Sequence, residues 1–107
     1  IKFINNKYSI ALMIDQRVTE GEKIKFFNEE AFTTTLPAQL ALKFNLKLVP
    51  IFIERKNNYL FKMIIYDPIK VDDNINKIII TEKLNKIIEG MIIKNPNQWI
   101  WTHDRWK

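Results

Sequence analysis

The apolar residues of this 107-residue chain are divided into short runs, and this division constrains the fold more than any other feature. Residues 8–15 and 24–28 have the length of buried strands rather than of helices. Residues 46–55 and 59–67 are rich in β-branched and aromatic residues, which predicts a hairpin. The Asn residues that join them tolerate the left-handed backbone of a tight turn. Pro50 has no N–H for a ladder and indicates an edge position or a bulge.

Stretches with helical spacing alternate with these runs. Residues 33–45 predict a short helix in which a Thr caps the first turn and Pro37 stands near the start. The acids of residues 67–74 suit the N-terminus of a longer helix. Its apolar stripe, which continues to Lys94, consists of Ile80, Leu84, Ile87, Ile88 and Met91. Helices that recur between strands must cover a sheet, so we expect an α/β fold with a partial mixed sheet covered by helices.

The closing segment predicts one more helix. Asn95 would be its N-cap and Pro96 its first helical residue, and Gln98 stands where it would close a capping box.

Three Trp residues follow in this segment, and two interpretations of them stay open. On a helix Trp99, His103 and Trp106 would share one stripe, and Arg105 would lie over Trp101 as a cation–π pair. Large aromatic residues usually fill a core, but Trp with Arg also suits a membrane interface or stacked nucleic-acid bases. Packing is the interpretation that we prefer.

Charge and composition narrow the classes of function. Lys and Arg number 17 against 12 Asp and Glu, which gives a formal net charge of +5. This balance favours anionic partners such as acidic proteins, phosphorylated lipids or nucleic acid, although the even spread of Lys is typical of a solvated surface. Charged residues interrupt every apolar stretch before the ~18 residues that a membrane span requires. We therefore expect no segment that crosses a membrane.

The side chains for catalysis are few. The chain has one His and no Cys, and a lone His assembles neither a nucleophilic triad nor a metal coordination shell. Gly21 and Gly90 are isolated, so a glycine-rich phosphate loop is absent from the sequence. We expect no metal and no cofactor. His103 is expected to pack beside the Trp residues, with titration in a reaction as the alternative.

A second polar group follows the first predicted strand. Asp15, Gln16 and Arg17 place a carboxylate, an amide and a guanidinium in a loop with Gly21 as its turn, in the region where α/β proteins bind ligands. The alternative is that Asp15 and Gln16 only satisfy the amides of a turn.

Two stretches, residues 15–50 and 87–107, carry a family resemblance. They resemble the C-terminal half of the bacterial lipid A biosynthesis acyltransferases, the lauroyl or myristoyl transferase group. The matching positions are Asp15-Gln16, Phe26-Phe27, Ala31, Thr33, Leu40-Ala41, Val49-Pro50, Asn95-Pro96, Gln98-Trp99, Trp101, His103 and Arg105-Trp106. Where the family usually has Gly after the Phe pair this chain has Asn28, which also tolerates a left-handed turn.

The resemblance implies a fold and a reaction. Residues 1–107 would be the C-terminal part of a single glycerolipid-acyltransferase-like domain, without the upstream anchor helix. The family moves a fatty acyl group from acyl carrier protein to a hydroxyl of a phosphorylated glucosamine lipid at the cytoplasmic face of the inner membrane. Its catalytic H-x-x-x-x-D/E pair cannot start at His103, because the acidic position would lie beyond Lys107. Alone, the fragment is therefore expected to be inactive.

The resemblance also suggests where substrate binds. Asp15, Gln16 and Arg17 are expected to line the substrate cleft, and the wall of the cleft is expected to be shaped by Phe26, Phe27 and Thr33. The expected partners are acyl carrier protein, a phosphorylated glycolipid acceptor and the membrane surface as a peripheral contact, and no nucleic acid. Two alternatives remain: an acyltransferase for another glycolipid such as a phosphatidylinositol mannoside, and a small basic nucleic-acid-binding module.

Overall fold

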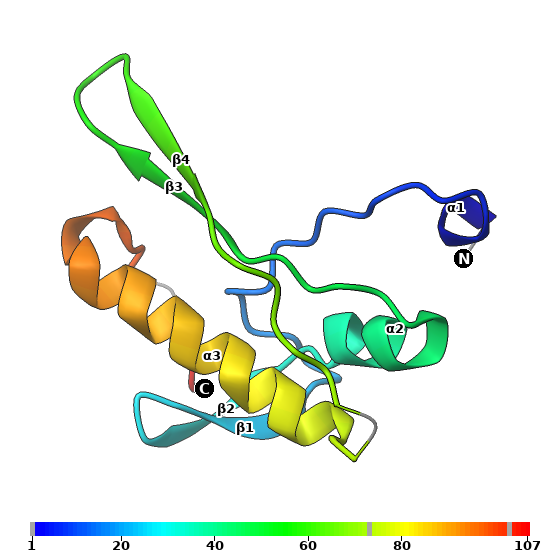
Figure 1. Cartoon of the computed structure of the whole chain (residues 1–107). Coiled ribbons are helices and arrows are strands. Elements are labelled where there is room, and N and C mark those ends of the chain that lie inside the picture. The colour runs from blue at the N-terminus through cyan, green and yellow to red at the C-terminus, as the bar shows by residue number, and fades with distance from the viewer. Residues whose placement is uncertain (1, 73, 103) are drawn as a thin grey trace.

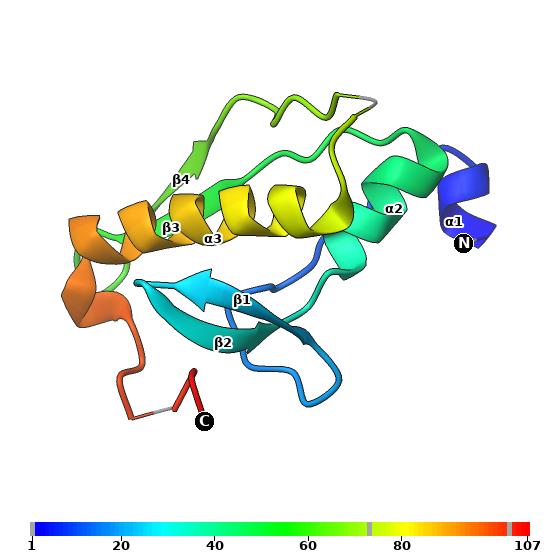
Figure 2. The same ribbon diagram turned by 90° about the horizontal axis from the view of Figure 1, so that it is seen from below.

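The computed structural model describes residues 2–72, 74–102 and 104–107. In this part of the chain two small antiparallel sheets and three α-helices occur, which confirms the α/β expectation (Figure 1). In chain order the elements are α1 (Lys2–Asn5), β1 (Glu22–Phe26), β2 (Glu29–Thr33), α2 (Leu36–Phe44), β3 (Ile51–Arg55), β4 (Phe61–Ile65), α3 (Lys77–Lys94) and the 3₁₀ turn η1 (Pro96–Gln98). The β1–β2 hairpin lies on one side of α3 and the β3–β4 hairpin on the other (Figure 2).

The β1–β2 hairpin turns through Phe27 and Asn28, because Phe26 pairs directly with Glu29. Both turn residues have positive φ, 51° and 65°. This is the turn that best matches the twist of two antiparallel strands, and Asn is among the residues that adopt it. The expectation for Asn28 is confirmed. Strand β2 is not predicted from the sequence, because the Glu pair that opens it does not favour a strand.

Helix α3 carries the core. Its N-cap is Asn76, whose Oδ1 accepts a hydrogen bond of 3.0 Å from the backbone N–H of Ile79. No acid stands in its first turn, so the predicted role of the acids of residues 67–74 is wrong; Asp73 lies outside the described residues. The predicted end of this helix at Lys94 is confirmed. Within its predicted apolar stripe Ile80 and Leu84 are buried, and the other three residues are partly buried.

Two groups of buried side chains pack along α3. The first has Phe26, Ala31 and Ile92 at its centre, and the second has Ala38, Ile80 and Leu84. The partly buried residues around the first are Phe27, Ile88, Trp99 and Trp106, and those around the second are Ile14, Leu48, Ile69, Val71 and Ile75. The core therefore joins the β1–β2 hairpin to one end of α3 and α2 to the other.

Helix α2 confirms the short helix that was predicted, with Pro37 in its first turn. The predicted Thr cap is confirmed only in part: the hydroxyl of Thr34, which precedes the N-cap residue, accepts from the N–H of Leu36 at 3.3 Å. Thr35 occupies the N-cap position, but its hydroxyl accepts from the Gln39 amide at 2.7 Å and makes no capping bond. The helix ends at Asn45, whose left-handed backbone has φ 52°.

The β3–β4 hairpin is also confirmed, but its turn is not the one predicted. Asn57 does not adopt left-handed backbone; its Oδ1 accepts from the N–H groups of Tyr59 and Leu60 at 3.2 and 3.1 Å. Pro50 immediately precedes β3, and its carbonyl accepts from the N–H of Tyr66 at 3.0 Å. Pro50 thus needs no N–H of its own for the ladder.

Two other predictions of secondary structure are wrong. Residues 8–15 form no strand, because no other described segment pairs with their backbone. Among residues 95–102 and 104–107, which the structure describes, no helix follows η1, because side chains of this segment bond to the hairpins instead. The amide of Gln98 accepts from the N–H of Arg55 at 3.0 Å and donates to the carbonyl of Ile53 at 2.6 Å, so it does not close a capping box.

No helix in the described part of the chain combines the length and the apolar character that crossing a bilayer needs.

Candidate functional site

The loop that carries Asp15, Gln16 and Arg17 lies between the two halves of the core. Ile14, immediately before it, packs in the Ala38 cluster. Asp15 is half-buried, whereas Gln16 and Arg17 are exposed. The structure therefore brings these three predicted residues together on an anchored loop and presents two of them to solvent.

The far end of this loop is held by close packing. Gly21 donates its N–H to the carbonyl of Val18 at 3.2 Å, which confirms the predicted turn. A Cβ atom at Gly21 would lie 2.6 Å from the carbonyl oxygen of Thr33. No side chain fits at that distance, so only glycine lets the loop approach β2 this closely.

Arg105 holds the near end of the loop. Only 1% of this residue is exposed. Its Nε donates to the Asp15 carbonyl at 3.1 Å, its Nη1 to the Phe32 carbonyl at 2.6 Å and its Nη2 to the Thr33 hydroxyl at 2.9 Å. Its guanidinium also lies over the ring of Phe26, with 5.2 Å between Cζ and the ring centroid. One side chain from the tail thus joins the loop to β2.

The electrostatics of Arg105 follow from this position. Burial lowers the pKa of the guanidinium, and the nearby Asp15 carboxylate opposes that shift. Arginine nevertheless stays protonated in proteins. A permanent positive charge is therefore held beneath the loop, partly balanced by Asp15.

Arg17 extends over the outer side of β2. Its guanidinium lies 5.8 Å from the centroid of the Phe32 ring, and the Lys23 ammonium lies 5.7 Å from the same ring. Two cations thus share one aromatic ring beside the loop. A planar guanidinium supported in this way suits a phosphate or carboxylate ligand.

The predicted wall residues lie beneath this surface. Phe26 is buried in the core, where its ring packs with that of Phe27 at 4.9 Å and stacks on that of Trp106 at 5.5 Å between centroids. The buried hydroxyl of Thr33 accepts from Arg105 and donates to the Ala31 carbonyl at 3.0 Å. Phe26 and Thr33 support the loop from inside, and Phe27 is half-buried at the hairpin turn.

The tail places its Trp residues differently. Trp99 and Trp106 pack around Phe26, and the Nε1–H of Trp106 donates to the Phe26 carbonyl at 2.9 Å. The packing interpretation is thus confirmed for these two. Trp101 is exposed, and its predicted pairing with Arg105 is wrong because the guanidinium lies over Phe26. The prediction for His103 falls outside the described residues.

Two further buried polar residues were not predicted from the sequence. The Oε1 of Glu89 accepts from the N–H of Phe27 at 2.7 Å, and the Nδ2 of Asn85 donates to the Lys25 carbonyl at 3.1 Å. Together with Thr81 they recur every four residues along α3, so one polar stripe of the helix is buried. That spacing is visible in the sequence, but it would also fit a solvated face.

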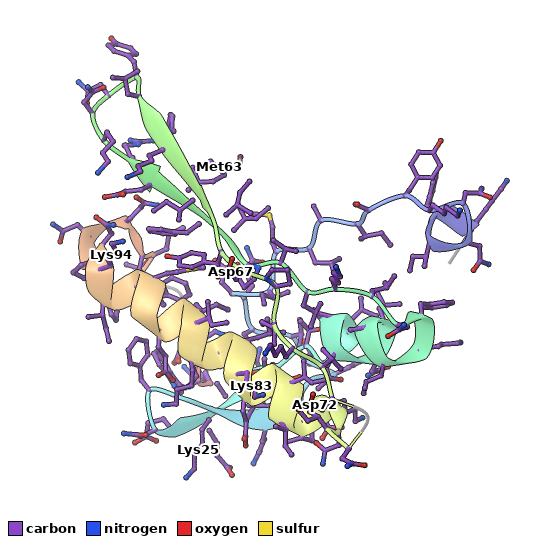
Figure 3. All side chains as sticks on the ribbon, in the orientation of Figure 1. Lys25, Met63, Asp67, Asp72, Lys83 and Lys94 are labelled. Atoms are coloured by element: carbon purple, nitrogen blue, oxygen red, sulfur yellow. The ribbon has the colours of Figure 1, made fainter. Side chains whose placement is uncertain are left out.

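Basic side chains are spread over the molecule, as the sequence indicated. Lys25, Lys83 and Lys94 lie on separate parts of β1 and α3 (Figure 3). Residues 2–72, 74–102 and 104–107 contain no group of three His, Cys, Asp or Glu that could hold a metal ion. The groups that the loop offers to a ligand are a carboxylate, an amide and a guanidinium, which form hydrogen bonds and ion pairs.

Comparison with known families finds one that covers this chain. The model of the family described as bacterial lipid A biosynthesis acyltransferase matches residues 1–107. No individual curated protein matches the chain. Since the match spans its whole length, the chain belongs to the bacterial lipid A biosynthesis acyltransferase family.

Proposed function

We propose that this chain supplies the acceptor-binding part of an acyltransferase. The enzyme moves a fatty acyl group from acyl carrier protein to a hydroxyl of a lipid A precursor in lipopolysaccharide biosynthesis. The membership of the family supports an acyltransferase of lipid A biosynthesis. The observation that supports the role of this chain is the loop of Asp15, Gln16 and Arg17, tethered at both ends while two of its side chains face solvent.

Each loop residue has a part that its chemistry suits. Arg17 binds a phosphate of the acceptor through the two donors of its planar fork. Gln16 exchanges hydrogen bonds with sugar hydroxyls, since its amide both donates and accepts. The Asp15 carboxylate accepts from a further hydroxyl and orients the sugar. Phe26 and Thr33 support the loop through their contacts with Arg105, and Phe27 packs against Phe26.

Bond making lies with other groups in this proposal. The family's H-x-x-x-x-D/E pair has no match within the 107 residues, whose one His is His103. The residues of this chain therefore bind and position, and the isolated chain should consume no acyl thioester.

The donor and the location belong to the same proposal. Acyl carrier protein is acidic, and a net charge of +5 raises its encounter rate in a way that added salt weakens. The enzyme acts at the cytoplasmic face of the inner membrane. The apolar face of β3–β4, with Ile51, Ile53, Met63 and Ile65 exposed and Arg55 at its outer end, suits contact with an anionic lipid surface.

Replacement of Asp15 tests the proposal. In the intact enzyme Asp15→Ala should lower turnover of the lipid acceptor by about tenfold or more, the equivalent of about 1.4 kcal/mol in the barrier. The Arg105 bond should persist, because it goes to the Asp15 backbone, which alanine keeps. Loss of the carboxylate removes part of the charge that balances the buried guanidinium, so stability should fall modestly while the fold is kept.

Glu20→Ala is the matched control, since Glu20 is an exposed acid at the turn of the same loop. It should keep wild-type turnover. Wild-type turnover of the Asp15→Ala enzyme would contradict the proposal.

A further inference from the structure

Arg105 connects the tail to two segments that lie far away in the sequence, the loop at Asp15 and strand β2. Its donors reach the Asp15 carbonyl, 90 residues away, the Phe32 carbonyl, 73 residues away, and the Thr33 hydroxyl, 72 residues away. The last residues of the chain run beside β2, where this contact is made (Figure 2). The tail is therefore joined directly, by a hydrogen bond, to the loop of Asp15, Gln16 and Arg17.

The acceptors of Arg105 are arranged so that its orientation is determined. The Nη1 and Nη2 donors bond to consecutive residues of β2, and the Thr33 hydroxyl is itself oriented by its bond to the Ala31 carbonyl. Because the guanidinium is planar and rigid, these two bonds aim the remaining Nε donor at the loop. Lysine has a single nitrogen, which cannot take the place of the three separate nitrogens with which the guanidinium reaches these acceptors.

The loop depends on this bond more than a strand would. Residues 9–17 share no ladder with another described segment, and the Arg105 bond to Asp15 is the hydrogen bond that joins them to the rest of the described chain. Ile14 anchors the loop by apolar packing, which restrains position but not orientation. The hydrogen bond to the Asp15 carbonyl therefore orients the peptide group between Asp15 and Gln16, from which both side chains extend.

We propose that Arg105 is a positioning residue for acceptor binding. It touches no substrate and acts through the Asp15 peptide, whose orientation decides where the Asp15 carboxylate stands. This inference rests on the proposed function of the loop. It assigns to the tail a role in substrate recognition besides its packing through Trp99 and Trp106.

A double-mutant cycle tests the inference in the intact enzyme, with kcat and KM for the lipid acceptor measured for wild type, Asp15→Ala, Arg105→Lys and the double variant. Arg105→Lys should lower kcat/KM for the acceptor about tenfold, and the same change in the Asp15→Ala background should cost less than about threefold. KM for the acyl donor should stay unchanged. Additive losses would overturn the inference, because a residue that acts through the Asp15 carboxylate has little left to lose once that carboxylate is gone.

Trp106→Phe is the matched control for loosening of the tail. It removes the bond to the Phe26 carbonyl and leaves every acceptor of Arg105 in place. It should lower the melting temperature while KM for the acceptor stays at the wild-type value. A rise in this KM equal to that of Arg105→Lys would also overturn the inference.

The same set of variants separates failure of the proposed function from failure of this inference. If Asp15→Ala alone has wild-type kinetics, the proposed function fails, whatever Arg105 does. If Arg105→Lys does not fold, Thr33→Val replaces it in the cycle, since valine keeps the shape of Thr33 and removes the acceptor of Nη2. Its cost should then depend on Asp15 in the same way, and an additive cost would overturn the inference.

Discussion

The two hairpins of this molecule have the same length and the same pairing but opposite environments. Each consists of two five-residue antiparallel strands. In β1–β2 one face is buried, with Ile24 and Phe26 each 1% exposed. In β3–β4 the corresponding face is open, with Met63 59% and Ile65 65% exposed (Figure 3). The backbone hydrogen bonds between strands are thus made in both hairpins. Whether a hairpin face is buried depends on which other parts of the chain pack against it.

The turns of the two hairpins also differ in whether they depend on other parts of the molecule. The β1–β2 turn places Phe27 at positive φ, which is unfavourable for a bulky residue, and Glu89 of α3 accepts its N–H. The β3–β4 turn is closed by its own residue, Asn57. One hairpin therefore depends on the helix, whereas the other is closed by local interactions.

Truncation of the aromatic core should produce the largest difference between the hairpins. Phe26→Ala should lower the free energy of unfolding by about 3–5 kcal/mol, because it leaves a cavity among Phe27, Trp99 and Trp106. Phe61→Ala, at an exposed position of β4, should cost about 0.5 kcal/mol. Denaturant unfolding of both variants measures the difference. Similar losses would mean that β3–β4 is packed as tightly as β1–β2.

Removal of the helix contact to the turn should have an intermediate effect. Glu89→Ala leaves the N–H of Phe27 without its acceptor and should cost about 1–3 kcal/mol. Glu82→Ala, on an exposed position of the same helix, should cost about 0.5 kcal/mol or less. Thermal unfolding with both variants side by side checks this. If Glu89→Ala is as harmless as Glu82→Ala, the turn does not depend on α3.

A polar residue on the open face should have the smallest effect on stability. Met63→Thr keeps a residue that favours strands at an exposed site, so the free energy of unfolding should change by about 0.5 kcal/mol or less. The same variant should bind anionic lipid vesicles more weakly, which a sedimentation assay measures. Unchanged vesicle binding would remove this face from the proposed membrane contact.

Predictions that depend on interactions between neighbouring residues are confirmed more often than those that depend on residues far apart in the chain. Helices α2 and α3 and the β3–β4 hairpin were predicted, because helical spacing and β-rich runs around a turn are properties of neighbouring residues. The strand at 8–15 and the helix at 95–107 were predicted from the same local features and are wrong. Their backbones and side chains respond to distant partners that no local spacing reveals.

In the candidate site, too, the residues near one another in the sequence were predicted, whereas a long-range contact was not. The loop of Asp15, Gln16 and Arg17 was identified from its residue types and the family resemblance, and the substrate role of all six predicted site residues stays a prediction. Arg105 was matched to the family, but its place under the loop was not foreseen. The predicted helix put its guanidinium over Trp101, whereas three acceptors more than 70 residues away draw it over Phe26.

The sequence by itself determined the α/β class, the two main helices, the turn at Asn28 and the membership of an acyltransferase family. Each of these depends on residue types at short spacing or on a motif. Only the tertiary structure decided which hairpin is buried, which side chains of the tail turn inward and what holds the loop of Asp15. The physical reason is that a buried guanidinium or carboxylate is stable only where several acceptors or donors converge, and that convergence exists only once distant segments have packed together.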